Sequence, residues 1–264
     1  MKIKNLVITS FVSLFSAALL AVSAHAQITS YNNTDALFGF RVTSGTGSTL
    51  DGMIDLGSVS QFNHTFTLSL GSIGTFMTTN FGADWFTRID AATGRTSVQW
   101  AVVADDIVAN TLWSTRNPSL VSPPWPRNSD SSQSITATNI ETVAGTYSGN
   151  PIATGTTSAM TQATSVANSW ASWQPGGANA SGISFATWNP TNEGSTNTVL
   201  AFDSILSSNT GGLHGTTLGF FTWNSDGTLT FTVVPEPETY ELMALGAVGL
   251  VGLQILRRRR TVRA

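Results

Sequence analysis

The sequence predicts a mainly β protein, a single antiparallel domain of β-sandwich or jelly-roll-like type with one or two short helices. Several segments alternate apolar and polar residues with the period of two that half-buried strands require. Turn formers are abundant: there are 24 glycines, and serine and threonine make up about three in ten residues of residues 27–234. Only 10% of the 264 residues are charged, which is low for a helical or cytosolic protein.

The strands are expected in separate short segments. Leu37–Val42 and Leu50–Leu56 are short candidates, and the apolar run Thr96–Ala104 predicts a strand buried on both faces. In residues 62–70, the alternation predicts a further strand. It places His64 on the inward face with the apolar side chains, so this histidine is expected to be packed rather than catalytic.

The clearest element is a hairpin near the end of the domain. Residues 224–227 read Asn-Ser-Asp-Gly, and Asp-Gly is a strong hairpin signal. Leu229, Phe231 and Val233 then share one face of the following strand, with threonines opposite. This strand leads directly to Pro235, so the domain is expected to end there. A calcium site at the same turn is conceivable, although turn formation alone explains these residues.

Two segments depart from the β pattern. Ser158–Trp173 places Val166, Trp170 and Trp173 at positions i, i+4 and i+7, which predicts an amphipathic helix that packs its tryptophans on the sheet. Ser119–Ser134 holds three prolines and a serine cluster, which predict a long surface loop.

The N-terminal segment has the three parts of a secretory signal peptide. Two lysines precede the mostly apolar residues 6–22. Ala24 and Ala26 then supply the small residues required at positions −3 and −1 before Gln27. We therefore expect residues 1–26 to be removed on export, with an uncleaved N-terminal anchor as the alternative.

The C-terminal segment predicts a membrane crossing. Thr239–Leu256 is mostly apolar and would span roughly 27 Å as a helix, which is marginal for one crossing. Four consecutive arginines follow it: Arg257, Arg258, Arg259 and Arg260. Basic residues remain on the cytoplasmic side of a membrane, so the main domain is expected on the opposite side.

A proline-rich segment precedes the predicted membrane helix. Pro235 and Pro237 fix φ and remove two backbone donors, and the residues before prolines favour extended conformations. A processing enzyme could grip such a stiff, extended segment. The candidate processing motif consists of Val234, Pro235, Glu236 and Pro237.

This motif, the glycine-containing apolar stretch and the arginine run together resemble the PEP-CTERM sorting signal of Gram-negative bacteria. The resemblance implies processing by a membrane exosortase, with the inner membrane as a transient location. It also implies delivery to the cell surface or its exopolysaccharide. It does not fix which bond is cut. The expected organisation is a signal peptide (1–26), an exported β-rich domain (27–234) and a sorting segment (235–264).

Charge and composition exclude several function classes. Residues 27–234 carry five arginines, twelve acidic residues and no lysine, a formal net charge of −7 that disfavours nucleic acid as a partner. The chain has no cysteine, which excludes disulfides, thiol catalysis and cysteine-based metal sites. None of the common catalytic or phosphate-binding motifs occurs. We therefore expect no catalytic residue, no metal and no cofactor.

Carboxylates are the remaining candidates for chemistry. A glycosidase needs two of them about 5–10 Å apart. Six aspartates could meet in space: Asp51, Asp55, Asp84, Asp90, Asp105 and Asp203. Asp105 and Asp106 are neighbours, whose side chains face opposite ways on a strand, so we expect a solvated strand end there rather than a pair. His214 lies in a glycine-rich loop with no partner at a fixed spacing.

The eight tryptophans are candidates for sugar stacking or for core packing. Three of them are expected in loops: Trp113, Trp125 and Trp188. The sequence thus predicts a non-enzymatic, exported structural or interaction protein of the surface or exopolysaccharide. A secreted carbohydrate-active enzyme and a lectin-like glycan-binding module are the alternatives.

Overall fold

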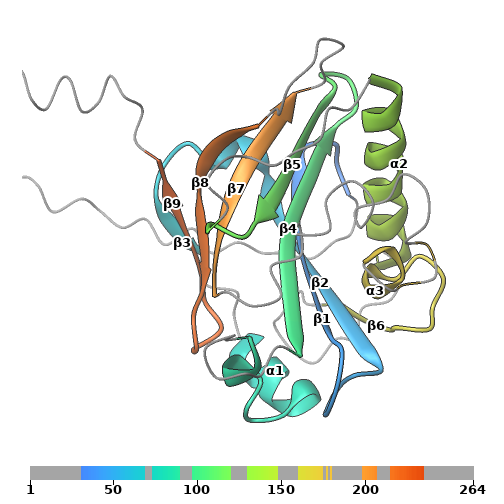
Figure 1. Ribbon diagram of the computed structural model, residues 1–264, viewed down its shortest axis with the longest axis vertical. Coiled ribbons are helices and arrows are strands. Elements are labelled where there is room, and N and C mark those ends of the chain that lie inside the picture. The colour runs from blue at the N-terminus through green and yellow to red at the C-terminus, as the bar shows by residue number, and fades with distance from the viewer. Residues whose placement is uncertain are drawn as a thin grey trace, which may run out of the picture.

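The computed structural model describes residues 31–68, 73–89, 97–119, 130–147, 160–174, 177, 179, 198–206 and 215–234. They form one nine-stranded antiparallel sheet with the strand order β3-β9-β8-β7-β5-β4-β1-β2-β6 (Figure 1). The strands are β1 (Asp35–Val42), β2 (Leu50–Ser58), β3 (Phe66–Leu68), β4 (Val98–Asp106), β5 (Thr111–Arg116), β6 (Met160–Ala163), β7 (Val199–Leu206), β8 (Thr216–Trp223) and β9 (Leu229–Val233). The helices are α1 (Ile73–Phe81), α2 (Asp130–Tyr147) and α3 (Trp170–Trp173), with short 3₁₀ helices η1 (Val59–Gln61) and η2 (Phe86–Arg88).

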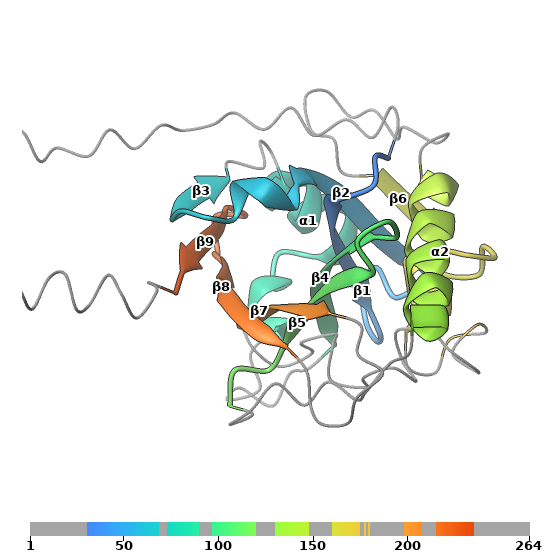
Figure 2. The same ribbon diagram turned by 90° about the horizontal axis from the view of Figure 1, so that it is seen from above.

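The prediction of a mainly β, antiparallel fold with few helices is confirmed, but the expected two-sheet sandwich is wrong. All nine strands belong to one sheet, and this sheet curls so that β3 and β2 approach each other (Figure 2). A curled sheet packs its inner face against itself, so it needs no second sheet to bury that face.

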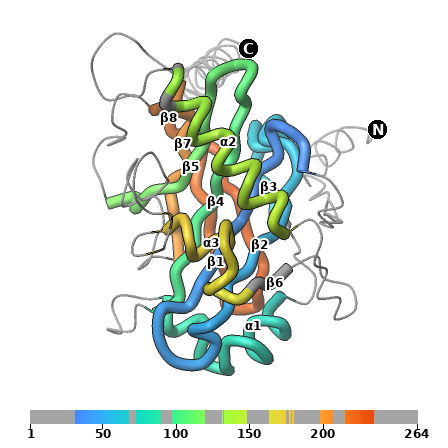
Figure 3. Tube along the Cα trace, turned by 90° about the vertical axis from the view of Figure 1, so that its right-hand side faces the viewer, coloured from blue at the N-terminus to red at the C-terminus, as the bar shows by residue number. Residues whose placement is uncertain are grey.

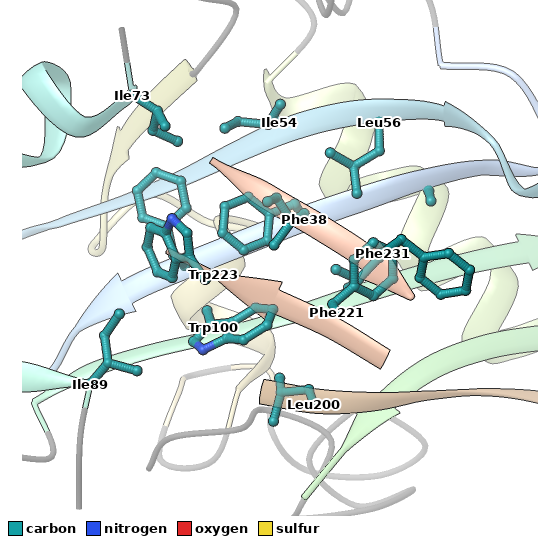
Figure 4. Close-up of a cluster of buried hydrophobic side chains, with 14 of the residues drawn as sticks. Phe38, Ile54, Leu56, Ile73, Ile89, Trp100, Leu200, Phe221, Trp223 and Phe231 are labelled. Carbon is teal, nitrogen blue, oxygen red and sulfur yellow. The ribbon is translucent and has the colours of Figure 1, made fainter. Parts of the chain in front are cut away.

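The inner face of the curl is filled with aromatic side chains (Figure 4). Phe38 on β1 lies edge-on to Trp223 on β8, with ring centroids 4.9 Å apart, and to Trp100 on β4 at 5.6 Å. All three side chains are fully buried. Edge-to-face packing at these distances is favourable beyond the apolar area it buries. These rings therefore join the first and last thirds of the chain.

Phe62 also connects the two sides of the curl. Phe62 follows β2 and η1, yet its ring lies 5.3 Å from Phe221 on β8 and 5.0 Å from Phe231 on β9. In the strand order, β2 is separated from β8 by four strands. Phe62 therefore packs across the open side of the sheet, which keeps the sheet curled.

Helix α1 and η2 close one end of the curl, at the bottom of Figure 1. Phe81 of α1 packs edge-on against Phe40 of β1, with centroids 5.7 Å apart. Trp85, directly before η2, lies 4.9 Å from Trp223. The start of α1 also touches the β8–β9 turn, where an added Cβ on Gly74 would lie 2.6 Å from the carbonyl oxygen of Asp226. The inner core is thus covered at this end.

Helices α2 and α3 cover the outer face over β4, β1 and β2 (Figure 3). A second core forms between them and the sheet, and it includes Leu37, Val103, Ile140 and the fully buried Trp170. Trp170 lies directly over Gly39, whose missing side chain leaves the space for the indole ring.

The predicted strands at residues 37–42, 50–56 and 96–104 and the C-terminal hairpin are confirmed. The predicted helix over Ser158–Trp173 is wrong, because Met160–Ala163 pairs with β2 as strand β6 and only four residues form α3. The predicted loop over Ser119–Ser134 is wrong at its end, because α2 begins at Asp130.

The predicted strand over residues 62–70 begins later than expected. Among the described residues of this segment, which end at Leu68, Phe66–Leu68 forms a strand, and His64 lies exposed in the turn before it. Its Nδ1 is 2.6 Å from the side-chain oxygen of Asn63. The prediction that His64 is packed inward is therefore wrong, because the alternation of residues does not continue through the turn.

We predict that Gly39→Ala destabilises the protein, because the new Cβ would lie 2.3 Å from the Trp170 ring and force it away from the sheet. The free energy of unfolding, measured by urea denaturation, should fall by about 1–3 kcal/mol. Gly145→Ala is the matched control, because its Cβ would meet no atom within 4 Å. That change should leave stability unaltered or raise it by up to about 1 kcal/mol. Equal effects of the two changes would contradict the packing role of Gly39.

Candidate functional site

The C-terminal end of the sheet is where the predicted sorting segment begins. Strand β9 lies between β3 and β8, with Val233 opposite Gly219. The amide of Val234 still donates to the carbonyl of Leu218 at 2.9 Å, and the Val234 side chain is 38% exposed. Proline has no amide hydrogen, so the donor pattern stops at Pro235. The sheet therefore holds the chain up to the residue before the first proline.

The other predicted sorting, anchoring and cleavage residues lie outside the described part of the chain. They are Pro235, Glu236, Pro237, Arg257, Arg258, Arg259, Arg260, Ala24, Ala26 and Gln27. Their roles remain predictions from the sequence. Of the candidate processing motif, the structure describes Val234 alone.

The candidate carboxylates are dispersed, and three of them are fully buried on the outer face of the sheet. Asp51 on β2 accepts from the Tyr147 hydroxyl and from the Ala171 amide, each at 2.6 Å. These bonds tie the end of α2 and the start of α3 to the same carboxylate. Asp51 therefore fixes both helices on the sheet.

Asp203 forms an ion pair with a buried arginine. Its Oδ2 is 2.5 Å from Nε of Arg116 on β5, and its Oδ1 accepts from the Thr217 hydroxyl at 2.6 Å. Both charged side chains are nearly inaccessible to solvent. A buried pair of this kind is costly to break because the remaining charge would be uncompensated.

Asp105 differs from the other two because only one of its carboxylate oxygens has a hydrogen-bond partner in the described contacts. It is 0% exposed, its Oδ1 accepts from the Tyr31 hydroxyl, and its Oδ2 is buried with no hydrogen-bond partner among the described residues. Burial raises the pKa of Asp105 to about 7; the hydrogen bond from Tyr31 opposes this shift, and the nearby carboxylates of Glu141 and Asp106 contribute to it. The same burial and the Asp105 charge raise the pKa of Tyr31 far above its usual value.

The expectation that Asp105 is a solvated strand end is wrong. The two neighbours do face opposite ways: Asp105 points under Tyr31, whereas Asp106 accepts from the amides of Val108 and Ala109 in the β4–β5 turn. Tyr31 is the residue that sequence reasoning missed, because it lies 74 positions from Asp105. The hydrogen bond from Tyr31 to Asp105 fixes the residues that precede β1 on strand β4.

Two of the three remaining candidate aspartates are described. Asp55 accepts from the Gly57 amide at 2.7 Å, and burial raises its pKa to about 6. Asp84 is exposed and lies 3.9 Å from Arg88. Asp90 and His214 lie outside the described residues. Each described aspartate thus has its own local partners.

The structure also describes one of the three tryptophans expected in loops and the turn considered as a calcium site. Trp113, expected in a loop, lies on β5 and packs half-buried against the inner core, while Trp125 and Trp188 lie outside the described residues. At the β8–β9 turn, Asp226 accepts from the amide and hydroxyl of Thr228, as turn formation requires. Within the described ranges, no group of three or more histidine or acidic residues is arranged to hold a metal ion.

A hydroxyl-rich surface covers the outer face of β3, β9 and β8, where neither α2 nor α3 lies. Thr67, Thr230 and Thr222 form one row across the three strands. Thr232 and Phe220 form the next row. These three strands contain no charged residue. We call these five side chains the hydroxyl face; Thr67 and Thr232 are exposed and the other three are half-buried.

We predict that Asp105→Asn flattens the dependence of stability on pH. The folded-state pKa of about 7 lies above the ordinary value of 3.8, so the contribution of this group is fully present below pH 3.8 and lost as pH rises to about 7. The free energy of unfolding of the wild type should fall across this window, by up to about 1.4 kcal/mol per pH unit from Asp105. Asp51 and Asp55 shift in the same direction, so the variant should reduce the slope without abolishing it.

Asp84→Asn is the control for this measurement, because Asp84 is exposed and should leave the slope as it is in the wild type. Urea denaturation at a series of pH values between 4 and 8 would measure both variants. An unchanged slope in Asp105→Asn would show that Asp105 titrates near its ordinary pKa.

Comparison with protein families finds a match at the C-terminal end of the chain. The family model of the PEP-CTERM protein-sorting motif matches residues 233–260, which confirms the resemblance found in the sequence. Neither the curated proteins nor the solved structures contain a match to the chain. The structure shows no helix long and apolar enough to cross a membrane in the part of the chain that it describes, and Thr239–Leu256 lies outside that part. The chain therefore carries a PEP-CTERM protein-sorting motif at residues 233–260, and this motif implies export and processing through a C-terminal sorting signal.

Proposed function

We propose that this protein is a non-enzymatic structural or interaction protein of the cell surface, associated with exopolysaccharide. One observation carries the proposal: the sorting motif starts at the residue where the last strand of the sheet ends. All described strands and helices thus precede the sorting signal and form the domain that this signal delivers. A processing enzyme that removes the signal would release the folded sheet intact.

The arrangement of the acidic residues supports a structural role. Asp51 holds α2 and α3, Asp203 neutralises Arg116 and Asp105 binds Tyr31. Each of these three carboxylates is fully buried and makes contacts that fix one element on another. A hydrolytic pair would instead need to reach a substrate across a sugar-binding site.

The hydroxyl face supports association with a polysaccharide. Threonine hydroxyls both donate and accept hydrogen bonds, as sugar hydroxyls do. Neighbouring strands bring the hydroxyls of one row together on strands without charged residues, and those of Thr67 and Thr230 lie 3.4 Å apart. The half-exposed ring of Phe220 adds an apolar surface on which a sugar ring could stack. A neutral glycan chain is the partner that this surface fits.

A carbohydrate-active enzyme is the second candidate, favoured by one observation. Asp105 has a pKa of about 7 and lies near the carboxylate of Glu141, and a raised pKa is typical of a general acid. The complete burial of Asp105 beneath the outer face favours the structural role over this one. Hydrolysis of purified exopolysaccharide by the wild type, lost in Asp105→Asn, would support the enzyme.

We predict that replacing Pro235, Glu236 and Pro237 together by alanine leaves an unprocessed protein at the inner membrane. The change removes the residues on which recognition by the processing enzyme depends, while the sheet up to Val234 is unaltered. Cell fractionation and intact-mass analysis would measure the product. Pro118→Ala, in an exposed turn after β5, is the control and should be processed as the wild type. Normal release of the triple variant would contradict the role of the motif.

We predict that placing charge on the hydroxyl face weakens retention by exopolysaccharide. In the variant with Thr67→Glu and Thr232→Glu, the fraction of released protein that co-sediments with exopolysaccharide from the same host should fall several-fold. Carboxylates at these positions would interrupt the neutral hydrogen-bonding surface. The control places the same two charges at Thr75 and Thr138, which are exposed on α1 and α2. Equal retention of the two variants would contradict a binding role for this face.

A further inference from the structure

The strand that precedes the sorting motif lies inside the sheet. β9 pairs with β8 over its whole length and with β3 through Phe66–Phe231 and the two following pairs. Leu229 and Phe231 are fully buried, and Phe231 contacts the rings of Phe62 and Phe221. Removing β9 from the sheet would therefore open the inner core.

The sheet continues to hold the chain up to the motif. The Val233 amide donates to the Thr65 hydroxyl at 3.2 Å, and the Val234 amide donates to the Leu218 carbonyl at 2.9 Å. The next residue is Pro235, so no spacer separates the last sheet hydrogen bond from the motif. An enzyme that binds its substrate as an extended strand needs free backbone donors and acceptors. The sheet already uses those of β9.

The distance to the membrane is also short. Five residues lead from Val234 to Thr239, where the predicted membrane segment begins, and they reach at most roughly 17 Å. While the chain is anchored, the end of β9 must therefore lie close to the membrane surface. The processing enzyme then works between the membrane and the folded domain.

We propose that the folded sheet sets the N-terminal limit of processing, so that the cut bond lies on the carboxyl side of Val234 and the enzyme works against the end of β9. This inference rests on the proposed processing of the sorting segment. Cleavage transfers the acyl carbon of the cut bond to water or to an amine acceptor, and the nitrogen that leaves with the tail gains a proton. The released domain keeps β9 complete, and the nearby domain surface limits how fast the enzyme can reach the motif.

The test compares the full-length chain with a variant that carries Gly-Ser-Gly-Ser-Gly-Ser between Val234 and Pro235, both in a host with the processing enzyme. Pulse-labelling would measure the rate of processing, and intact mass would locate the new C-terminus. We expect the wild-type product to end at Val234 or later. We expect the linker variant to be processed several-fold faster, and its product to be heavier by the whole insert. The matched control carries the same insert after Val108, which is 85% exposed in the β4–β5 turn, and should be processed at the wild-type rate.

The outcomes test three statements separately: the N-terminal limit of the cut, the effect of the folded domain on the rate, and the processing itself. A wild-type product or a linker product that ends within β9, before Val234, would show that the enzyme enters the sheet. An unchanged rate in the linker variant would show that the folded domain does not limit access. Persistence of the full-length chain in the wild type and in both insertion variants would instead refute the proposed processing.

Discussion

The curl of the sheet around its aromatic side chains is the constraint on which the rest of the structure depends. Phe62 packs on the rings of β8 and β9, and Phe38, Trp100 and Trp223 fill the space between the two halves. A chain without cysteine has no covalent crosslinks to hold such a shape. Apolar burial and ring packing must therefore supply the stability that disulfides give to many exported domains.

The outer face is stabilised differently, because there the helices and the chain entry are attached through buried polar groups. Asp51 accepts from Tyr147 and Ala171, and Tyr31 donates to Asp105. Such contacts give a unique geometry but cost the desolvation of a carboxylate, which is seen in the raised pKa values of Asp51 and Asp105. Side chains that look like catalytic candidates in the sequence therefore serve here to position α2, α3 and the start of the domain.

Elements that depend on interactions between nearby residues could be predicted from the sequence, whereas elements that depend on contacts between distant residues could not. The strands with clear alternation and the Asp-Gly hairpin depend on local residues, and both were predictable. Helix α2 was missed because its buried face includes Gln133 and Thr136 beside small residues, so it lacks a strong apolar stripe. β6 was mistaken for a helix because its pairing with β2 is distant in the chain and overrides the local pattern.

The same division applies to the site. The sorting motif is a continuous segment, so its residues could be found without a structure, and the family match agrees. The partners of the candidate aspartates come from distant elements: Asp203 meets Arg116 across 87 positions, and Asp51 meets Ala171 across 120. No spacing rule reveals such contacts. The partners of each carboxylate could therefore be identified only from the three-dimensional structure.

The pairing of β3 with β9 has a consequence for the order of events during export. Thr67 and Thr230 meet on neighbouring strands although they are 163 residues apart, so β3 has to wait for nearly the whole domain before it gains its partner. Contacts of such long range form slowly, and a chain that crosses a membrane from its amino end delivers them last. The predicted membrane segment Thr239–Leu256 follows five residues after Val234, so the final strand would reach its partner at nearly the same time as this segment would stop translocation.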